Sequence, residues 1–256
     1  MQSPRTILIT GASSGIGAAL ALAYAAPTIT LLLTARDETR LNDVAQQCRT
    51  RGATVHTASI DVCDKPVLAA WIERMDDATP IDTVIANAGI STGSFSGEET
   101  PDAAEQVFAV NVGGVIHTIH PIIPRMVARG GGAIAIMSSL AGICPLPSAP
   151  AYSASKAAVR YYGEALHAAL KPRGVHVCVI CPGWITTPLT DKNDFPMPWI
   201  MPSHRAAGHI IRNLGKKKSR IAFPWQLYAL VTFAGIFPHF MRAALLARMS
   251  KKRWKS

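Results

Sequence analysis

The fold is decided by the stretch Thr6-Ile7-Leu8-Ile9-Thr10-Gly11-Ala12-Ser13-Ser14-Gly15-Ile16-Gly17. Its first five residues form an apolar run that is typical of a strand, and the Ala- and Leu-rich residues 18–26 that follow are typical of a helix. The glycines, spaced GxxxGxG, let the backbone turn tightly and approach a ligand. The start of the helix favours an anion. This context is typical of a dinucleotide-binding turn, although an ordinary strand-to-helix turn has the same order of elements.

Strand-like and helix-like segments alternate along the rest of the chain. The strand-like runs are residues 30–34, 54–59, 83–86, 133–137, 175–181 and 221–223, and the helix-like segments are residues 38–51, 65–77, 101–129, 151–170 and 203–214. The alternation predicts an α/β fold, a Rossmann-like doubly wound parallel sheet of about seven strands with helices on both faces. We expect one domain over residues 1–256, with a basic and apolar C-terminal extension at 216–256. Ligands of such sheets bind at the carboxyl ends of the strands.

The composition restricts the class of protein. Of the 256 residues, 49% are hydrophobic and 16% charged, which excludes a disordered chain. The N-terminal residues show no signal-peptide pattern, so we expect a cytoplasmic protein. The five cysteines lack metal-ligand spacing, and we expect free thiols and no metal site. Cys178 and Cys181 form a CxxC, but their apolar surroundings favour a buried strand over a redox or metal site.

Positive charge is concentrated at the C-terminus. Of the 26 Lys and Arg residues, 12 lie in residues 195–256, and no Asp or Glu follows Asp194. The preceding residues hold 14 basic against 16 acidic side chains, so the formal net charge of +10 comes from the tail. A nucleic-acid-binding protein would be more evenly basic, and we expect no nucleic-acid partner.

Tyr152 and Lys156 place a phenol and an ammonium on one face of a predicted helix, because they are four residues apart. A nearby cation favours the tyrosinate and lowers the pKa of the phenol. Such a pair is suited to proton transfer to or from an alcohol or ketone oxygen. Taken alone, the pair also fits an ordinary solvated helix face, so the other motifs of the chain are needed to distinguish the two interpretations.

The motifs at the predicted strand ends, taken in order over residues 6–187, resemble those of the short-chain dehydrogenase/reductase family in its single-domain form. They are the turn at 10–17, Asp61-Val62, the Ala86-Asn87-Ala88-Gly89 motif, Asn111, Ser139, the YxxxK motif Tyr152/Lys156, and the PGxxxT motif at 182–187. One such motif is weak evidence, whereas the ordered set is specific. The resemblance implies an enzyme that transfers a hydride between NAD(P) and a CH–OH group.

The resemblance also implies roles for individual residues. Tyr152 would exchange a proton with the substrate oxygen, Lys156 would lower the pKa of Tyr152 and hold the nicotinamide ribose, and Ser139 would stabilise the substrate oxygen. Asn111 would hold a water linked to Lys156, and an Asn inside a helix indicates a local perturbation. Strand alternation predicts that Ser138 points away from the site. The predicted cofactor-binding residues are Gly11, Ser13, Ser14, Gly15, Ile16, Gly17, Arg36, Asp61, Val62, Asn87, Ala88, Gly89, Tyr152, Lys156, Pro182, Gly183, Ile185 and Thr187.

The choice of cofactor depends on the end of the second predicted strand. NAD-preferring relatives carry an acidic residue there, whereas this chain has Ala35 followed by Arg36. The absence of a carboxylate and the presence of a guanidinium favour the 2′-phosphate of NADP(H). Asp37 leaves NAD(H) open as an alternative, since its carboxylate can pair with Arg36 or point toward the ribose.

Apolar side chains dominate the segments that should line the substrate pocket, residues 90–95, 140–151 and 184–202. The predicted pocket residues are Ser139, Phe95, Ile143, Leu146, Trp184, Leu189 and Trp199. We therefore expect a lipophilic substrate, for example a 3-oxoacyl or lipid-like carbonyl compound reduced with NADPH. A sugar or polyketide-like alcohol is the alternative, and a non-catalytic nucleotide-binding regulator is the alternative from another class. The Pro-rich run at 195–202 is either a mobile lid or an ordered loop.

The C-terminal extension combines an apolar run, residues 225–237, with basic residues on both sides. Lys and Arg flanking an apolar helix that contains Trp is the pattern of interfacial membrane binding, here on the inner face of the membrane. The alternatives are packing on the body of the protein, an oligomer interface, and a true membrane span, for which the run is short. The family resemblance implies a homodimer or homotetramer.

Overall fold

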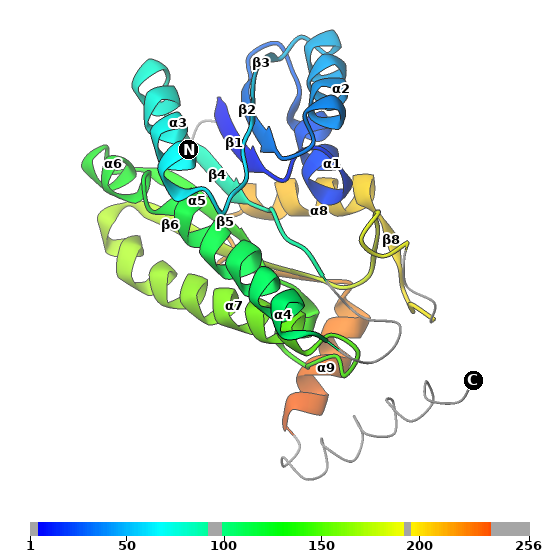
Figure 1. Cartoon of the computed structure of the whole chain (residues 1–256). Coiled ribbons are helices and arrows are strands. Elements are labelled where there is room, and N and C mark those ends of the chain that lie inside the picture. The colour runs from blue at the N-terminus through cyan, green and yellow to red at the C-terminus, as the bar shows by residue number, and fades with distance from the viewer. Residues whose placement is uncertain (1–4, 92–98, 192–195, 237–256) are drawn as a thin grey trace.

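The computed structural model describes residues 5–91, 99–191 and 196–236. A seven-stranded parallel sheet in the order β3-β2-β1-β4-β5-β6-β9 forms its centre (Figure 1), which confirms the predicted fold class. The strands are β1 (Thr6–Thr10), β2 (Thr30–Ala35), β3 (Thr54–Ser59), β4 (Thr83–Ala86), β5 (Gly132–Met137), β6 (Val175–Pro182) and β9 (Arg220–Phe223). A separate small pair joins β7 (Ile185–Thr186) and β8 (Met201–Pro202). The order reverses between β1 and β4, which places the ligand-binding edge beside the carboxyl ends of these two strands.

Helices cover both faces of the sheet. They are α1 (Gly15–Tyr24), α2 (Glu38–Thr50), α3 (Lys65–Ala78), α4 (Pro101–Phe108), α5 (Gly114–Ile119), α6 (Ile123–Ala128), α7 (Pro150–Leu170), α8 (Ser203–Gly215) and α9 (Trp225–Ile236). Short helical turns are η1 (Ala109–Gly113), η2 (Leu140–Gly142) and η3 (Lys171–Arg173). Most predicted bounds differ from these by one to three residues at an end, where caps and hydrogen bonds decide the last turn.

Alternation along the strands divides the core into two apolar layers. Ile7 and Ile9 of β1 face one side, where α1, α2 and α8 pack, and Leu8 faces the other side with α3, α5 and α7. Both layers are apolar because a parallel sheet is covered on both faces. Helix α7 approaches the sheet closely at Gly163, where an added Cβ would lie 2.6 Å from a methyl of Val179. The helix that carries Tyr152 and Lys156 therefore has a fixed distance from the sheet.

The long helix predicted at 101–129 is interrupted twice. It passes from α4 through the π-helical turn η1 into α5, and a turn at residues 120–122 separates α5 from α6. Among the described residues, only the combined segment Pro101–Ala128 has the length and hydropathy to cross a membrane. It packs instead as a core element, since Val110, Val115 and Ile119 are buried in the layer that α7 covers.

A third and smaller apolar cluster lies under α9. Leu140, Val179 and Cys181 are its buried members, and Leu227 and Val231 of α9 pack against them. Figure 1 shows α9 at the end of the sheet where α4 and α7 begin. The first 12 residues of the apolar run at 225–237 thus form a helix that covers one edge of the sheet.

Candidate active site

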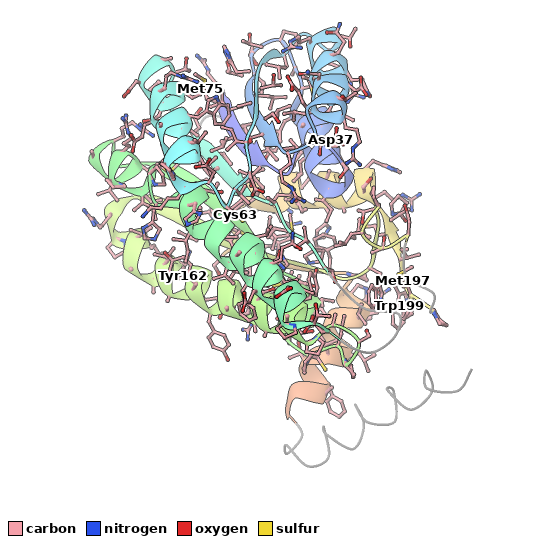
Figure 2. All side chains as sticks on the ribbon, viewed as in Figure 1. Asp37, Cys63, Met75, Tyr162, Met197 and Trp199 are labelled. Carbon is pink, nitrogen blue, oxygen red and sulfur yellow. The ribbon has the colours of Figure 1, made fainter. Side chains whose placement is uncertain are left out.

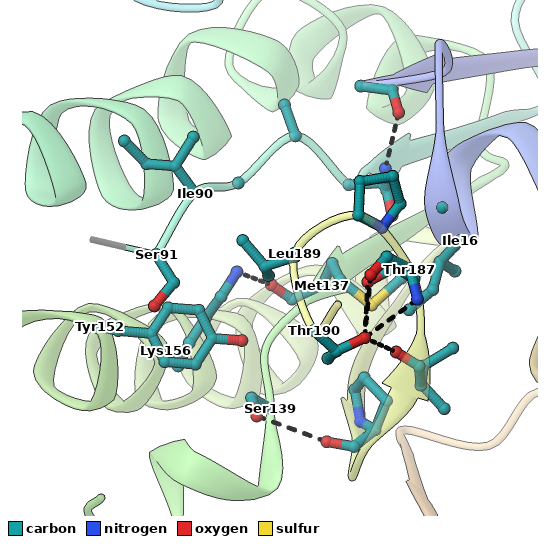
Figure 3. Close-up of a pocket in the computed structure, with 18 of the residues that line it drawn as sticks. Ile16, Ile90, Ser91, Met137, Ser139, Tyr152, Lys156, Thr187, Leu189 and Thr190 are labelled. Atoms are coloured by element: carbon teal, nitrogen blue, oxygen red, sulfur yellow. Dashed lines mark hydrogen bonds between the residues drawn. The ribbon is translucent and has the colours of Figure 1, made fainter. Parts of the chain in front are cut away.

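Tyr152 and Lys156 lie side by side on α7 and face the carboxyl ends of the strands (Figure 3). The Lys156 Nζ lies 5.7 Å from the centre of the Tyr152 ring and donates a hydrogen bond of 2.9 Å to the carbonyl of Met137 at the end of β5. Lys156 is only 3% exposed, and burial lowers its pKa to about 8. The pair is therefore a buried constellation and not a solvated helix face.

The pKa of Tyr152 is raised, whereas the Lys156 cation alone was expected to lower it. Desolvation raises the pKa of the phenol above its ordinary value, and a hydrogen bond with Ser139 opposes that increase. Desolvation is the larger of these two effects, so the pKa of the phenol stays raised although the Lys156 ammonium lies 5.7 Å from the centre of its ring. The phenol is consequently protonated at neutral pH, as a general acid has to be.

The side chains of Ser138 and Ser139 diverge at the end of β5, as the alternation of strand residues predicts, although both residues contribute to the cavity lining. Ser138 is buried and donates a 2.7 Å hydrogen bond to the backbone carbonyl of Lys156, which fixes α7 against the strand. Ser139 faces the cleft, and its Oγ lies 3.4 Å from the carbonyl oxygen of Pro182 (Figure 3). It also accepts the N–H of Ala141, so the hydroxyl is held next to the Tyr152 phenol.

Asn111 occupies the π-helical turn η1, which confirms the perturbation expected at this Asn. Its side chain is fully buried, accepts the N–H of Ile90 at 2.8 Å, and donates to the carbonyl of Ile90 and to Ser155 Oγ at 3.0 Å each. Since these bonds anchor the backbone after β4 to α7, Asn111 acts at least as a positioning residue. Both its Oδ1 and the Lys156 Nζ lie beside Gly89. A π-turn at this place is typical of a functional site.

The glycine turn between β1 and α1 is shaped by close contacts that exclude side chains. Gly11 has a φ of +66°, and an added Cβ would lie 2.8 Å from the Cα of Ala88. A Cβ on Gly17 would overlap the carbonyl of Gly11. The Asn87 Nδ2 donates to the carbonyls of Thr10 and Gly11, at 3.0 and 3.2 Å. The turn and the residues after β4 therefore form one rigid cradle, a shape that fits a pyrophosphate.

The charged side chains that follow β2 are paired with one another. Asp37 is the N-cap of α2, where it accepts hydrogen bonds from the backbone N–H and the Nε of Arg40 at 2.9 and 2.6 Å, and these bonds lower its pKa. The Arg36 guanidinium lies 3.8 Å from Asp61 in a half-exposed ion pair. Asp37 is therefore engaged by Arg40 and makes no pair with Arg36, the alternative that the sequence left open.

A single cavity of about 440 Å³ joins these groups, a volume suited to a cofactor and a small substrate. Every predicted cofactor-binding residue lines it except Gly17, which supports the turn from behind. The catalytic candidates Ser139, Tyr152 and Lys156 line it as well, whereas Asn111 lies behind the wall. One cavity thus contains the glycine cradle, the arginines and the buried pair of a hydroxyl and an ammonium. This arrangement fits a nicotinamide dinucleotide.

The predicted substrate-pocket residues are only partly brought together. Leu146, Trp184 and Leu189 line the cavity with Ser139. Ile143 does not, because it packs in the third apolar cluster against the region of α9. Trp199 is 49% exposed and lies on the loop before β8 (Figure 2), outside the lining. Phe95 lies outside the described residues.

Several lining residues lie outside the predicted sets, among them Arg40, Leu227 and Val231. Leu227 and Val231 of α9 lie on the cavity wall, although they are 38 or more residues beyond Leu189 in the chain. Arg40 lies there too, on the first turn of α2, whereas Arg36 precedes the helix. The i, i+4 spacing of 227 and 231 is a signal that places both on one helix face, but it does not say which cavity that face lines.

The thiols of Cys178 and Cys181 lie buried in β6, and burial raises their pKa values to about 12 and about 11. A thiol of this kind is a poor nucleophile and a poor metal ligand, because both roles require the thiolate. The CxxC is therefore part of the core, as its apolar surroundings predicted.

Fold and site together define a nicotinamide-dinucleotide oxidoreductase with a Ser-Tyr-Lys constellation. The model of the short chain dehydrogenase family matches residues 5–196. An uncharacterized oxidoreductase of Myxococcus xanthus (strain DK1622) is 33% identical over 250 residues, which cover 97% of this chain and 98% of that protein. The chain therefore belongs to the short-chain dehydrogenase/reductase family, and it is an NAD(P)-dependent oxidoreductase.

Two solved structures extend the likeness to three dimensions. A short-chain dehydrogenase from Sphingobium yanoikuyae in complex with NADPH is 27% identical, with a TM-score of 0.78, over 98% of this chain and 96% of that chain. A 3-oxoacyl-[acyl-carrier protein] reductase from Brucella melitensis ATCC 23457 is 28% identical, with a TM-score of 0.76, over 85% and 89%. The first likeness includes almost the whole chain, and thus the region of α9.

Proposed function

We propose that the protein reduces a lipophilic ketone to a secondary alcohol with NADPH. The observation that carries this proposal is the buried Ser139–Tyr152–Lys156 constellation at the centre of a cavity whose two ends differ chemically. Arginines lie at the end near β2, and apolar side chains lie at the end near α9. When bound, the nicotinamide supplies the hydride to the carbonyl carbon.

The side chains of the constellation account for the proton. Tyr152 donates its phenolic proton to the carbonyl oxygen as the alcohol forms, and Ser139 donates a hydrogen bond to the same oxygen. The Lys156 ammonium stabilises the resulting tyrosinate, an interaction that is strong because the group is almost fully buried. Its pKa of about 8 keeps a proton available for Tyr152 near neutral pH.

The apolar end of the cavity supports a lipophilic substrate. Within the described lining after residue 137, Lys156 is the only charged side chain, and Leu140, Leu146, Leu189 and Leu227 supply much of the wall. A free sugar would have to place part of its hydroxyl groups against these leucine side chains, which costs free energy where no hydrogen bond is formed. The relative described as a 3-oxoacyl-[acyl-carrier protein] reductase agrees with a long acyl substrate, which is one member of this class.

NADPH is preferred in this proposal because two guanidiniums lie at the end of β2, where the carboxylates of Asp37 and Asp61 are already paired with arginines. Arg36 and Arg40 line the cavity, Ala35 occupies the position of the acidic residue in NAD-preferring relatives, and Asp37 is engaged as a helix cap. A 2′-phosphate would gain charge-assisted hydrogen bonds there.

The substitution Tyr152→Phe tests the proposed reaction. It should retain NADPH binding, measured by nucleotide fluorescence, and lower kcat for a panel of aliphatic ketones by about 10²–10⁴-fold. Tyr161→Phe on the same helix is the matched control, because Tyr161 is 66% exposed and its activity should equal that of the wild type. If the wild type reduces no ketone of the panel, or if Tyr152→Phe retains full activity, the proposed function is wrong.

A further inference from the structure

The helix α9 is mostly apolar, with Gln226, Tyr228 and Thr232 as its polar side chains. Its 12 residues include no charged side chain. One face, with Leu227 and Val231, packs on the third apolar cluster and forms part of the cavity wall. Gly183 makes this packing close, since an added Cβ there would lie 2.8 Å from a methyl of Leu227. The inner face alone therefore accounts for how α9 is held to the body.

The outer face exposes large apolar side chains to water. Trp225 is 72% exposed, Leu230 is 56% exposed and Phe233 is 60% exposed. Trp225, Ala229 and Phe233 recur at four-residue intervals, which places them on one stripe next to Leu230, with Gln226 and Thr232 as its polar members. An exposed stripe of large apolar side chains marks a surface that binds something.

The charges around α9 indicate what covers this stripe. Lys216, Lys217 and Lys218 precede the helix in the chain and are exposed, Arg220 is paired with Glu164, and residues 237–256 contain six more Lys and Arg without any Asp or Glu. An anionic lipid surface attracts such a set. A symmetric pair of α9 helices from two copies of the chain would instead bring two strongly cationic segments together.

We propose that the outer face of α9 binds the surface of an anionic lipid bilayer, with Trp225, Leu230 and Phe233 in the acyl region. Because the inner face of the helix packs on the body of the protein, only its outer face is available to a bilayer, which places the described part of α9 in the plane of the interface. Because the opposite face lines the cavity, the bilayer surface lies about one helix diameter, roughly 10 Å, from the substrate end. The binding does not depend on the proposed reaction, although it would bring a lipophilic substrate to the site.

Flotation of the full-length protein with vesicles tests this surface. The wild type should bind vesicles of phosphatidylcholine with phosphatidylglycerol, bind vesicles of phosphatidylcholine alone more weakly, and lose binding as salt increases. The double substitution Leu230→Ser/Phe233→Ser should lower the partition coefficient at least about tenfold, since two large apolar side chains no longer enter the bilayer. Val67→Ser on α3 is the matched control for the loss of an exposed apolar side chain, because Val67 is 50% exposed far along the chain from α9.

Three further measurements distinguish membrane binding from an oligomer interface and from a loss of the fold. Lys251→Gln/Lys252→Gln/Arg253→Gln should weaken binding to the anionic vesicles and leave the weak binding to neutral vesicles unchanged. Melting temperature and NADPH binding of Leu230→Ser/Phe233→Ser should equal those of the wild type, which shows that the fold is retained. Sedimentation velocity of the wild type and this variant should give the same mass. The proposal is overturned if the wild type does not bind anionic vesicles at low salt, or if the substitutions dissociate an oligomer without changing vesicle binding.

Discussion

Burial of Lys156 disfavours the charged form of the side chain, which is the form that its proposed role requires. Its ammonium is 3% exposed, and burial lowers its pKa from an ordinary 10.5 to about 8. At roughly 1.4 kcal/mol for each pH unit, the buried charge costs about 3 kcal/mol of stability at neutral pH. The protein retains a charge in an unfavourable place, which is typical of a group with a role in catalysis.

This cost predicts a specific pH dependence of stability. Below pH 8 both the folded and the unfolded states hold the Lys156 proton, and the full cost applies. Between pH 8 and 10.5 the unfolded state binds more protons than the folded state, so stability increases with pH. We therefore expect Lys156→Met to unfold with a higher free energy than the wild type at pH 7, and the difference to decrease toward pH 9.5.

Urea unfolding at several pH values measures that difference. The exposed Lys65 of α3, substituted as Lys65→Met, is the control for the loss of a lysine. A difference between Lys156→Met and the wild type that stays constant from pH 7 to 9.5 would show that the burial of the ammonium does not set its pKa.

Arg36 and Arg40 together carry the proposed preference for NADPH. We expect Arg36→Asp to lower kcat/KM for NADPH by about 10–100-fold, because a charge-assisted hydrogen bond to the 2′-phosphate is replaced by repulsion. The value for NADH should change little. Steady-state kinetics with both cofactors checks this, and Arg74→Asp, an exposed arginine of α3, makes the same change in charge away from the cavity. An unchanged ratio between the two cofactors would contradict the assignment.

At the scale of elements, the turn between β1 and α1 depends on glycines for two different reasons. Gly11 and Gly15 have φ values of +66° and +56°, where other residues are strained. Gly17 has no such φ, yet a Cβ there would overlap the carbonyl of Gly11. The repeated pattern in the sequence therefore reflects backbone conformation at Gly11 and Gly15, and close approach of backbone atoms at Gly11 and Gly17.

Gly17→Ala should disrupt the turn because backbone atoms cannot move aside as the end of a flexible side chain can. We expect a loss of about 1–3 kcal/mol in the free energy of unfolding and a loss of NADPH binding of at least about tenfold. Gly131→Ala is the matched control, since no atom lies within 4 Å of the added Cβ. Equal melting curves and equal affinities for the two variants would refute this explanation of the GxxxGxG spacing.

The interruption of the helix at 101–129 shows the limit of reading elements from periodicity. Asn111 indicated a local perturbation, but not a π-turn. The turn is stabilised by the bonds of Asn111 with Ile90 and Ser155, which are 21 and 44 residues away in the chain. Such bonds are invisible to a pattern that extends over one or two helical turns.

At the scale of the whole molecule, α9 adds Leu227 and Val231 to a cavity whose other lining residues lie between Gly11 and Thr190. We expect Leu227→Ala to lower kcat/KM for a long-chain aliphatic ketone by about tenfold and to change the value for a short ketone little, because only the long chain reaches α9. Kinetics with a homologous series of ketones measures this. A uniform decrease over the series would indicate that α9 supports the fold without contacting the substrate.

The sequence by itself determined the parallel α/β fold, the cofactor turn, the catalytic candidates and the buried CxxC, because each depends on local periodicity or on motifs of fixed spacing. Only the tertiary structure decided that Asp37 caps α2, that Ile143 and Trp199 lie off the cavity, and that Leu227 and Val231 lie on it. The physical reason is that a residue's nearest partners in space are set by how whole elements pack. At the turn between β1 and α1 the residues that form the site are also neighbours in the sequence. At α9, in contrast, the chain returns to the site from more than 30 residues away.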